Sequence, residues 1–212
     1  MGDPFSLIIL VGAVSLLPLL IVASTAFLKI SIVMSLLRNA LGVQQVPSNL
    51  ALYGLALILT AYIMAPVFSP LFERLTSPGT MANASTVMSG LQESAEPLRK
   101  FMMRFSQPEH RDFFLTTAKR MWGAEASANV AQSDFLILMP AFVVSELAAA
   151  FQIGFLLYLP FIVIDLIISN VLLAMGMMMV SPVTISLPLK LFLFVAVDGW
   201  TRLIGGLVLS YV

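Results

Sequence analysis

The sequence predicts an all-α, membrane-associated protein with long, proline-broken apolar helices and hairpins. Hydrophobic residues make up 59% of its 212 residues and charged residues only 10%, whereas soluble domains are typically about 25% charged. Two long apolar regions flank a polar one, and prolines punctuate the apolar regions. Apolar runs of about 20 residues can cross the ~30 Å hydrocarbon core of a bilayer as helices.

The composition also excludes several classes of site. The net charge is zero, so nothing indicates an affinity for nucleic acid. Because cysteine is absent, the chain has no disulfide, no catalytic thiolate and no cysteine-ligated metal. The N-terminal stretch "MGDPFSLIIL" lacks a basic region and a small-residue cleavage site, so we expect the first apolar segment to be retained.

Polarity divides the chain into three zones. Residues 1–72 are predicted to form an N-terminal apolar helical pair. Residues 73–134 carry most of the charge, with acids and bases nearly balanced, and are predicted to form a polar helical insertion. Residues 135–212 are apolar again and are predicted to form a C-terminal helical region that contains the methionine-rich stretch "MGMMM".

In the first zone we expect one helix from Phe5 to Leu37 and a second from Leu50 to Phe68. Their connector, "RNALGVQQVPSN", has Gly42 where a helix C-cap is expected and Ser48 or Asn49 where the next N-cap is expected. A first helix of about 33 residues would be about 50 Å long, which exceeds the hydrocarbon core.

The middle zone is predicted to contain a loop and two short amphipathic helices. The stretch "TSPGTMANAST" has the composition of a loop. Two rows of apolar residues then follow helical spacing: Leu98, Phe101, Met102 and Phe105, and Phe114, Ala118, Met121 and Trp122. Two alternatives remain open, because the helices either dock on another surface or form a hairpin that covers its own core.

Prolines divide the last zone. Pro140, Pro160, Pro182 and Pro188 predict helices near 141–159, 161–180 and 189–211. The corner "LLYLPFIVI" has no polar turn, although the tip of an ordinary membrane hairpin needs polar residues where its backbone meets water. Irregular backbone is tolerated there when it is buried in protein or lines a cavity, so we expect a multi-subunit assembly.

Charged residues lie inside or beside the apolar zones. They are Lys29, Arg38, Glu146, Asp165, Lys190, Asp198 and Arg202. Each would cost about 2.5–3.5 kcal/mol at a bilayer centre on insertion scales, so Lys29, Glu146 and Asp165 are expected to pair, face water or contact a neighbouring subunit. An ion pair that fixes helix register, a proton relay, a subunit contact and pore lining all remain open. Lys190 and Arg202 lie near the ends of the last predicted helix, where long side chains can reach the interface.

Catalytic constellations are missing from the sequence. The single histidine, His110, lies in the polar zone and is interpreted as a surface residue. No HExxH, GxSxG, P-loop or GxGxxG motif occurs, so we predict a protein that is not an enzyme and uses no metal or cofactor. The alternative function is a small ion-coupled transporter with Asp165 or Glu146 as proton carrier. An intramembrane hydrolase would lack its nucleophile and base.

Two long apolar blocks, which cover about half the chain, contain unusual strings. These strings are "RNALG", "QQVPSN", "ELAAAFQIGF", "PFIVIDL", "MGMMM" and "LPLKL". With them the chain resembles the FliP/SctR family, whose members form the export-gate core of type III secretion systems. The missing signal sequence and the short N-terminus favour the virulence-type injectisome over the flagellum. Residues 73–134 carry no part of the resemblance.

The resemblance implies a pentamer-like ring of copies, joined by FliQ/SctS-type and FliR/SctT-type subunits, around a pore for unfolded proteins. It implies the bacterial inner membrane, with much of the assembly on the periplasmic side. Arg38 lies in a short loop that is expected to be cytoplasmic, which also places the polar zone in the periplasm. The resemblance further implies that Met177, Met178 and Met179, beside Gly176, form a constriction in the pore.

Methionine has the chemistry that such a constriction needs. Its side chain is unbranched, flexible and polarizable, so a ring of methionines can close on itself or around diverse passing chains. Leucines would seal but adapt less, and polar residues would wet the opening. Gly176 permits a local bend and Pro182 interrupts the helix. In an arbitrary membrane protein the triplet would be better explained as core filling, and the resemblance is what favours a seal.

Overall fold

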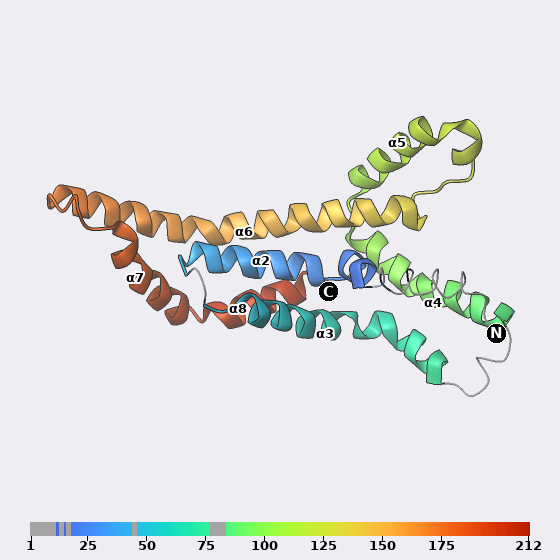
Figure 1. Cartoon of the computed structure of the whole chain (residues 1–212), viewed down its shortest axis with the longest axis horizontal. Helices are drawn as coiled ribbons and strands as arrows, with labels where there is room; N and C mark the ends of the chain where they lie inside the picture. The colour runs from blue at the N-terminus through green and yellow to red at the C-terminus, as the bar shows by residue number, and fades with distance from the viewer. Residues whose placement is uncertain (1–11, 13–14, 16–17, 44–45, 77–83) are drawn as a thin grey trace. The chain divides into compact units, whose positions relative to one another are not determined.

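The computed structural model describes residues 12, 15, 18–43, 46–76 and 84–212. Within these ranges the secondary structure is entirely helical, with connecting turns and no strand, which confirms the predicted all-α class (Figure 1). The helices are α2 (Phe27–Ala40), α3 (Asn49–Thr76), α4 (Ala84–Phe105), α5 (Pro108–Ser127), α6 (Phe135–Ala174), α7 (Pro182–Ala196) and α8 (Gly199–Leu209).

Among the described residues, two helices are long and apolar enough to cross a membrane. They are the Asn49–Pro70 part of α3 and the whole of α6. Two bent helix pairs, Pro18–Ser24 with α2 (78°) and α7 with α8 (62°), raise the number of candidate spans to four if each pair is one span. These assignments rest on length and composition, and they agree with the predicted membrane association.

The first zone has the predicted connector but not one straight first helix. Gly42 has a left-handed φ of 78°, and the Ser48 hydroxyl accepts a hydrogen bond from the Ala51 N–H at 3.3 Å, so both predicted caps are confirmed. The expected helix from Phe5 to Leu37 is instead bent by 78° between Ser24 and Phe27. Its predicted start lies outside the described residues, as does most of the predicted loop (77–83).

The predicted break at Pro160 is wrong. The helix α6 runs for 40 residues through both Pro140 and Pro160, so the expected boundary between 159 and 161 does not exist. A proline inside a helix removes one backbone hydrogen bond, and groups on neighbouring helices or a small local adjustment of the helix can satisfy the freed carbonyl. The apolar corner therefore needs no polar turn, because it is continuous helix.

The predicted boundaries after α6 also need correction. That helix ends at Ala174 rather than at 180, and α7 begins at Pro182 with Ser181 as its N-cap. Pro182 therefore starts a helix, as proline at the first helical position commonly does. The expected single helix over 189–211 is divided at Asp198, whose left-handed φ of 53° separates α7 from α8.

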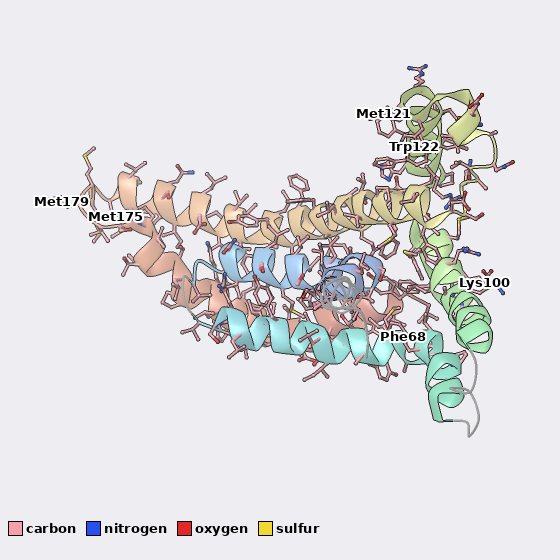
Figure 2. All side chains as sticks on the ribbon, turned by 45° about the vertical axis from the view of Figure 1, so that its right-hand side comes forward. Phe68, Lys100, Met121, Trp122, Met175 and Met179 are labelled. Atoms are coloured by element: carbon pink, nitrogen blue, oxygen red, sulfur yellow. The ribbon has the colours of Figure 1, made fainter. Side chains whose placement is uncertain are left out.

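The chain divides into two compact units, and the first comprises residues 1–28 and 64–146. In this unit α4 packs on the start of α6, where the rings of Phe101 and Phe142 lie 5.7 Å apart between centroids. Phe101 and Met102 are buried, as expected from the first apolar row. In the second row Ala118 is buried, but Met121 and Trp122 are 76% and 41% exposed (Figure 2).

The second unit comprises residues 29–63 and 147–212. Within it α2 lies between α6 on one side and α3 with α8 on the other (Figures 1 and 2). This central position explains why Ile30, Val33, Met34 and Leu37 of α2 are almost completely buried. Gly154 of α6 lets that helix approach α2 closely, since a Cβ atom at this position would lie 2.2 Å from Leu36 Cδ1.

We expect Gly154→Ala to lower the free energy of unfolding by about 1–2 kcal/mol, because overpacking forces a neighbouring side chain to move. The cost stays moderate because the nearest atom is the flexible end of Leu36. Thermal unfolding of the purified protein in detergent measures the effect. Gly54→Ala is the matched control, since its Cβ would meet no atom within 4 Å. Equal stability of the two variants would contradict the close approach.

Candidate functional site

The methionine triplet lies in the loop that joins α6 to α7. The N–H of Gly176 donates to the Leu173 carbonyl and the N–H of Met177 donates to the Leu172 carbonyl, at 3.0 and 2.9 Å. With the φ of 72° at Gly176, these bonds form a Schellman motif that ends α6. Glycine suits this position because it adopts a left-handed φ without the steric cost of a Cβ. Gly176 therefore turns the chain where the methionines begin.

The methionine side chains of this loop are exposed. Met177 is 39%, Met178 82% and Met179 101% exposed. By contrast, Met34 and Met64 are completely buried. Figure 2 shows Met179 at the tip of the hairpin that α6 and α7 form. The triplet therefore fills no core among the described residues, and its sulfur atoms are available to other surfaces.

A partly buried ion pair ties the two arms of this hairpin together. Lys190 of α7 is 4% exposed, and its Nζ lies 2.6 Å from Asp165 Oδ2 of α6. The same ammonium group donates a hydrogen bond to the Ala40 carbonyl at the end of α2, at 3.3 Å. The Asp165 side chain is 39% exposed, although its Oδ1 atom is buried, so its carboxylate is only partly accessible to water. One lysine thus connects α2, α6 and α7.

The remaining charges of the apolar zones lie in different settings. Lys29 is 4% exposed, and its Nζ lies 3.7 Å from the centroid of the Tyr211 ring, which is a cation–π contact near the C-terminus. Glu146 is 2% exposed, in the first unit. Asp198 is exposed at the corner between α7 and α8 and accepts a hydrogen bond from the Thr201 hydroxyl at 3.0 Å.

Arg38 stabilises the connector between α2 and α3. Its Nη1 donates to the Pro47 carbonyl at 3.5 Å and to the Asn49 side-chain oxygen. Arg202 instead is exposed on α8 and lines an apolar groove. Neither arginine lies at the methionine loop.

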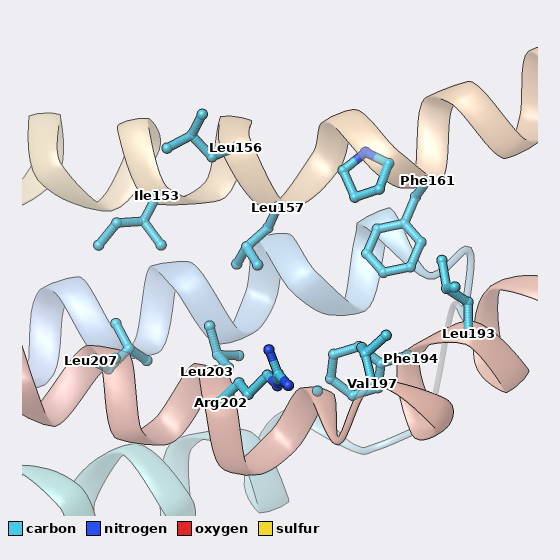
Figure 3. A pocket seen from close by; sticks show the side chains of 13 residues that line it. Ile153, Leu156, Leu157, Phe161, Leu193, Phe194, Val197, Arg202, Leu203 and Leu207 are labelled. Carbon is cyan, nitrogen blue, oxygen red and sulfur yellow. The ribbon is translucent and has the colours of Figure 1, made fainter.

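That groove, with a volume of about 540 Å³, lies between α6 and the α7–α8 corner (Figure 3). On α6 and α8 its lining residues recur at helical spacing: Ile153, Leu156, Leu157, Pro160 and Phe161, and Gly199, Arg202, Leu203, Gly206 and Leu207. Arg202 is the one charged residue among the described residues that line it. This groove is not predicted from the sequence. Gly206 on α8 is the signal that could have indicated it, since this glycine leaves open space that a side chain would fill.

His110 is not the simple surface residue that was expected. It is half-buried, and its Nδ1 lies 2.8 Å from the Ser145 hydroxyl oxygen of α6. Ser145 is 2% exposed, donates to the Ala141 carbonyl at 2.7 Å and accepts from the Gln107 N–H at 2.9 Å. Arg111 caps the end of α4 beside it, with Nη1 2.9 Å from the Met103 carbonyl. This polar cluster fastens the α4–α5 corner to α6.

No group of three or more histidine, cysteine or acidic side chains that could hold a metal ion occurs among the described residues. The geometry instead presents two exposed features in the second unit, the methionine tip and the apolar groove. Both are suited to contact with other macromolecules rather than to bond-making chemistry.

Comparisons with a family model and with individual proteins agree on the family of this chain. Residues 10–207 match the model of the FliP family. The chain is 52% identical over 210 residues to "Yop proteins translocation protein R" of Yersinia pestis, covering 99% of this chain and 97% of that protein. It is 49% identical to "Harpin secretion protein HrcR" of Erwinia amylovora and 48% identical to "Virulence protein YscR" of Salmonella typhimurium, with the same coverage in both cases.

Proposed function

Because the chain belongs to the FliP family and resembles its injectisome members at about half of all positions, we propose that it is a channel-forming subunit of a type III secretion export gate. Unfolded substrate proteins pass through this channel, and Met177, Met178 and Met179 seal it when it is empty. Members of the family are structural components of the export apparatus and not enzymes.

The exposed methionine tip is the observation that carries this proposal. Three consecutive thioether side chains project from a hairpin end that Gly176 turns and the Lys190–Asp165 pair holds. When several copies converge on one axis, such tips form a dry apolar constriction that excludes ions. The flexible, polarizable side chains then rearrange around the varied residues of a passing polypeptide.

Exposed apolar surface in the second unit supports assembly with other subunits. Large side chains project along α6, among them Phe151, Phe155, Leu159, Val163, Leu166 and Ile167. At about 60 Å, α6 is roughly twice as long as the hydrocarbon core, so lipid alone cannot cover it. The partners that fit are further copies of this chain in a pentamer-like ring, and FliQ/SctS-type and FliR/SctT-type subunits. Nucleic acid is not expected among them.

The proposed location is the bacterial inner membrane, with much of the assembly on its periplasmic side. The apolar helices are consistent with a membrane location. In this topology the polar residues 73–134 form a periplasmic insertion, and the connector that Arg38 stabilises faces the cytoplasm. The α4–α5 corner, fastened through Ser145, then forms a rigid periplasmic element.

The gate is tested by replacing all three methionines with alanine in the assembled complex. The combined Met177→Ala, Met178→Ala and Met179→Ala variant is expected to leak small ions while secretion continues, because the shorter side chains leave the constriction open and hydrated. Ion flux across vesicles or cells that contain the complex measures the leak.

The matched control replaces the same three methionines with leucine. Leucine keeps the apolar volume, so this complex is expected to stay ion-tight, and its secretion is expected to slow because leucine adapts less to passing chains. An alanine variant that is as ion-tight as the unmodified complex would refute the proposed seal.

A further inference from the structure

We propose that Met178 and Met179 are oxidation sites, at which a peroxide or a hypohalous acid converts the thioether to a sulfoxide and thereby loosens the seal. The oxidation of these two side chains does not depend on the function of the protein, but the effect of oxidation on ion flux rests on the proposed gate. The reactant class is a small, uncharged two-electron oxidant, which can reach the sulfur atoms from the mouth of the pore because the proposed seal excludes ions rather than small neutral molecules.

Exposure separates these two methionines from the buried ones, although Met121 and Met175 are also exposed, at 76% and 67%. Met178 and Met179 are 82% and 101% exposed, whereas Met34, Met64 and Met102 are completely buried. Oxidation of sulfur side chains follows their accessibility to the oxidant. The hairpin tip is therefore expected to react before the buried methionines, which are expected to react only after local unfolding.

The reaction balances without any protein cofactor. A lone pair on the methionine sulfur attacks one oxygen of hydrogen peroxide, the O–O bond breaks, and a sulfur–oxygen bond forms. Proton transfer between the two peroxide oxygens releases one molecule of water. The sulfur loses two electrons and the peroxide is reduced by the same two electrons. The product is methionine sulfoxide, which is polar and a stronger hydrogen-bond acceptor than the thioether.

The loop tolerates this change without losing its fold. Its turn is held by backbone hydrogen bonds, from Met177 N to the Leu172 carbonyl at 2.9 Å and from Val180 N to the Met177 carbonyl at 3.3 Å. The side chains of Met178 and Met179 project away from these bonds into the open. Oxidation therefore alters the chemistry of the tip and leaves the hairpin in place.

A polar group at this tip has a large effect in the proposed gate. An apolar constriction excludes ions because water does not fill it, and sulfoxide oxygens would bind water there. Every copy in the ring contributes its own pair of sulfoxides, so the effect multiplies with copy number. The expected consequence is an oxidised complex that conducts small ions.

The test treats the assembled complex in lipid vesicles with limited hydrogen peroxide. Peptide mass spectrometry follows the oxidation of each methionine, and an ion-flux assay follows the leak in the same samples. Met178 and Met179 are expected to oxidise many-fold faster than Met34, Met64 and Met102, and the leak is expected to rise several-fold as they react. Methionine sulfoxide reductases with a thiol reductant are expected to reverse both changes.

Two variants assign the response to these sulfur atoms. The Met178→Leu and Met179→Leu double variant is expected to lose the peroxide-induced rise in ion flux, because it keeps apolar side chains but has no sulfur at these positions. Met121→Leu removes a methionine that is 76% exposed on α5 and is not part of the hairpin, and this variant is expected to keep the full peroxide response.

Two results would overturn the inference. One is oxidation of Met178 and Met179 no faster than that of the buried methionines, and the other is a fully oxidised complex that stays ion-tight. The triple alanine variant distinguishes a failure of the oxidation proposal from a failure of the proposed gate. If it leaks while the oxidised complex does not, this inference alone fails, and if both stay tight, the gate itself fails.

Discussion

Replacing Lys190 with methionine is expected to lower the free energy of unfolding by about 3 kcal/mol. Breaking a buried ion pair on one side typically costs about 3–5 kcal/mol, and the lower end applies because the Asp165 side chain is 39% exposed and keeps part of its hydration. The Lys190→Met variant also removes the hydrogen bond to the Ala40 carbonyl. Chemical or thermal unfolding in detergent measures the loss, and secretion is expected to fall with it.

A second replacement tests whether the pair itself is responsible. In the Lys190→Met and Asp165→Leu double variant no charge is left unpaired, and apolar replacement of a buried pair is often close to neutral. Much of the lost stability should therefore return. Lys119→Met on the exposed surface of α5 is the matched control and should change little. A double variant that is less stable than Lys190→Met would contradict the pairing.

Replacing Ser145 with alanine is expected to cost about 2–3 kcal/mol. The hydroxyl accepts the Gln107 N–H and lies 2.8 Å from His110 Nδ1, so its loss leaves two polar groups without their partner. Each buried polar group left unsatisfied costs about 1–3 kcal/mol. The cost at His110 is expected to be smaller, because this side chain is only half-buried and can hydrogen-bond to water instead.

Hydrogen exchange offers a local measurement of this change. Amides at the start of α5, near Gln107, are expected to exchange faster in Ser145→Ala, whereas amides of α2 should be unchanged. Ser133→Ala, on the turn before α6, is the serine control and should leave the exchange at α5 as it is in the unmodified protein. Unchanged exchange at α5 in Ser145→Ala would show that Ser145 does not fasten the corner.

The sequence could predict the helical class and the loop caps because these depend on local chemistry. Gly42 follows the end of α2 and Ser48 caps the start of α3, as expected. These features can be predicted because a left-handed φ and an N-cap hydroxyl are properties of single residues. The course of α6 could not be predicted in the same way. A helix either ends at a proline such as Pro160 or continues through it, depending on which groups replace the lost backbone hydrogen bond. Tertiary packing sets those groups.

The candidate site could also be predicted only in part from the sequence. The residues Met177, Met178 and Met179 could be singled out from the sequence through its resemblance to a family. Their exposure could not, because periodicity alone does not separate a loop from the end of an apolar helix. The link from Lys190 to Asp165 and Ala40 joins positions that are distant in the chain. Such a contact follows from tertiary packing and has no local signal.

Convergence of the methionine tips is the central claim, and thiol crosslinking tests it most directly. The chain has no cysteine, so Met178→Cys introduces a single thiol per copy. In the assembled complex a short bifunctional thiol reagent is expected to join neighbouring copies through this position, whereas Met121→Cys on α5 serves as the reference for a site outside the hairpin. Crosslinked oligomers at position 178 are the predicted result. Single, uncrosslinked chains that react only with lipid-soluble thiol reagents would contradict the account, because the tips would then face the membrane and not a shared pore.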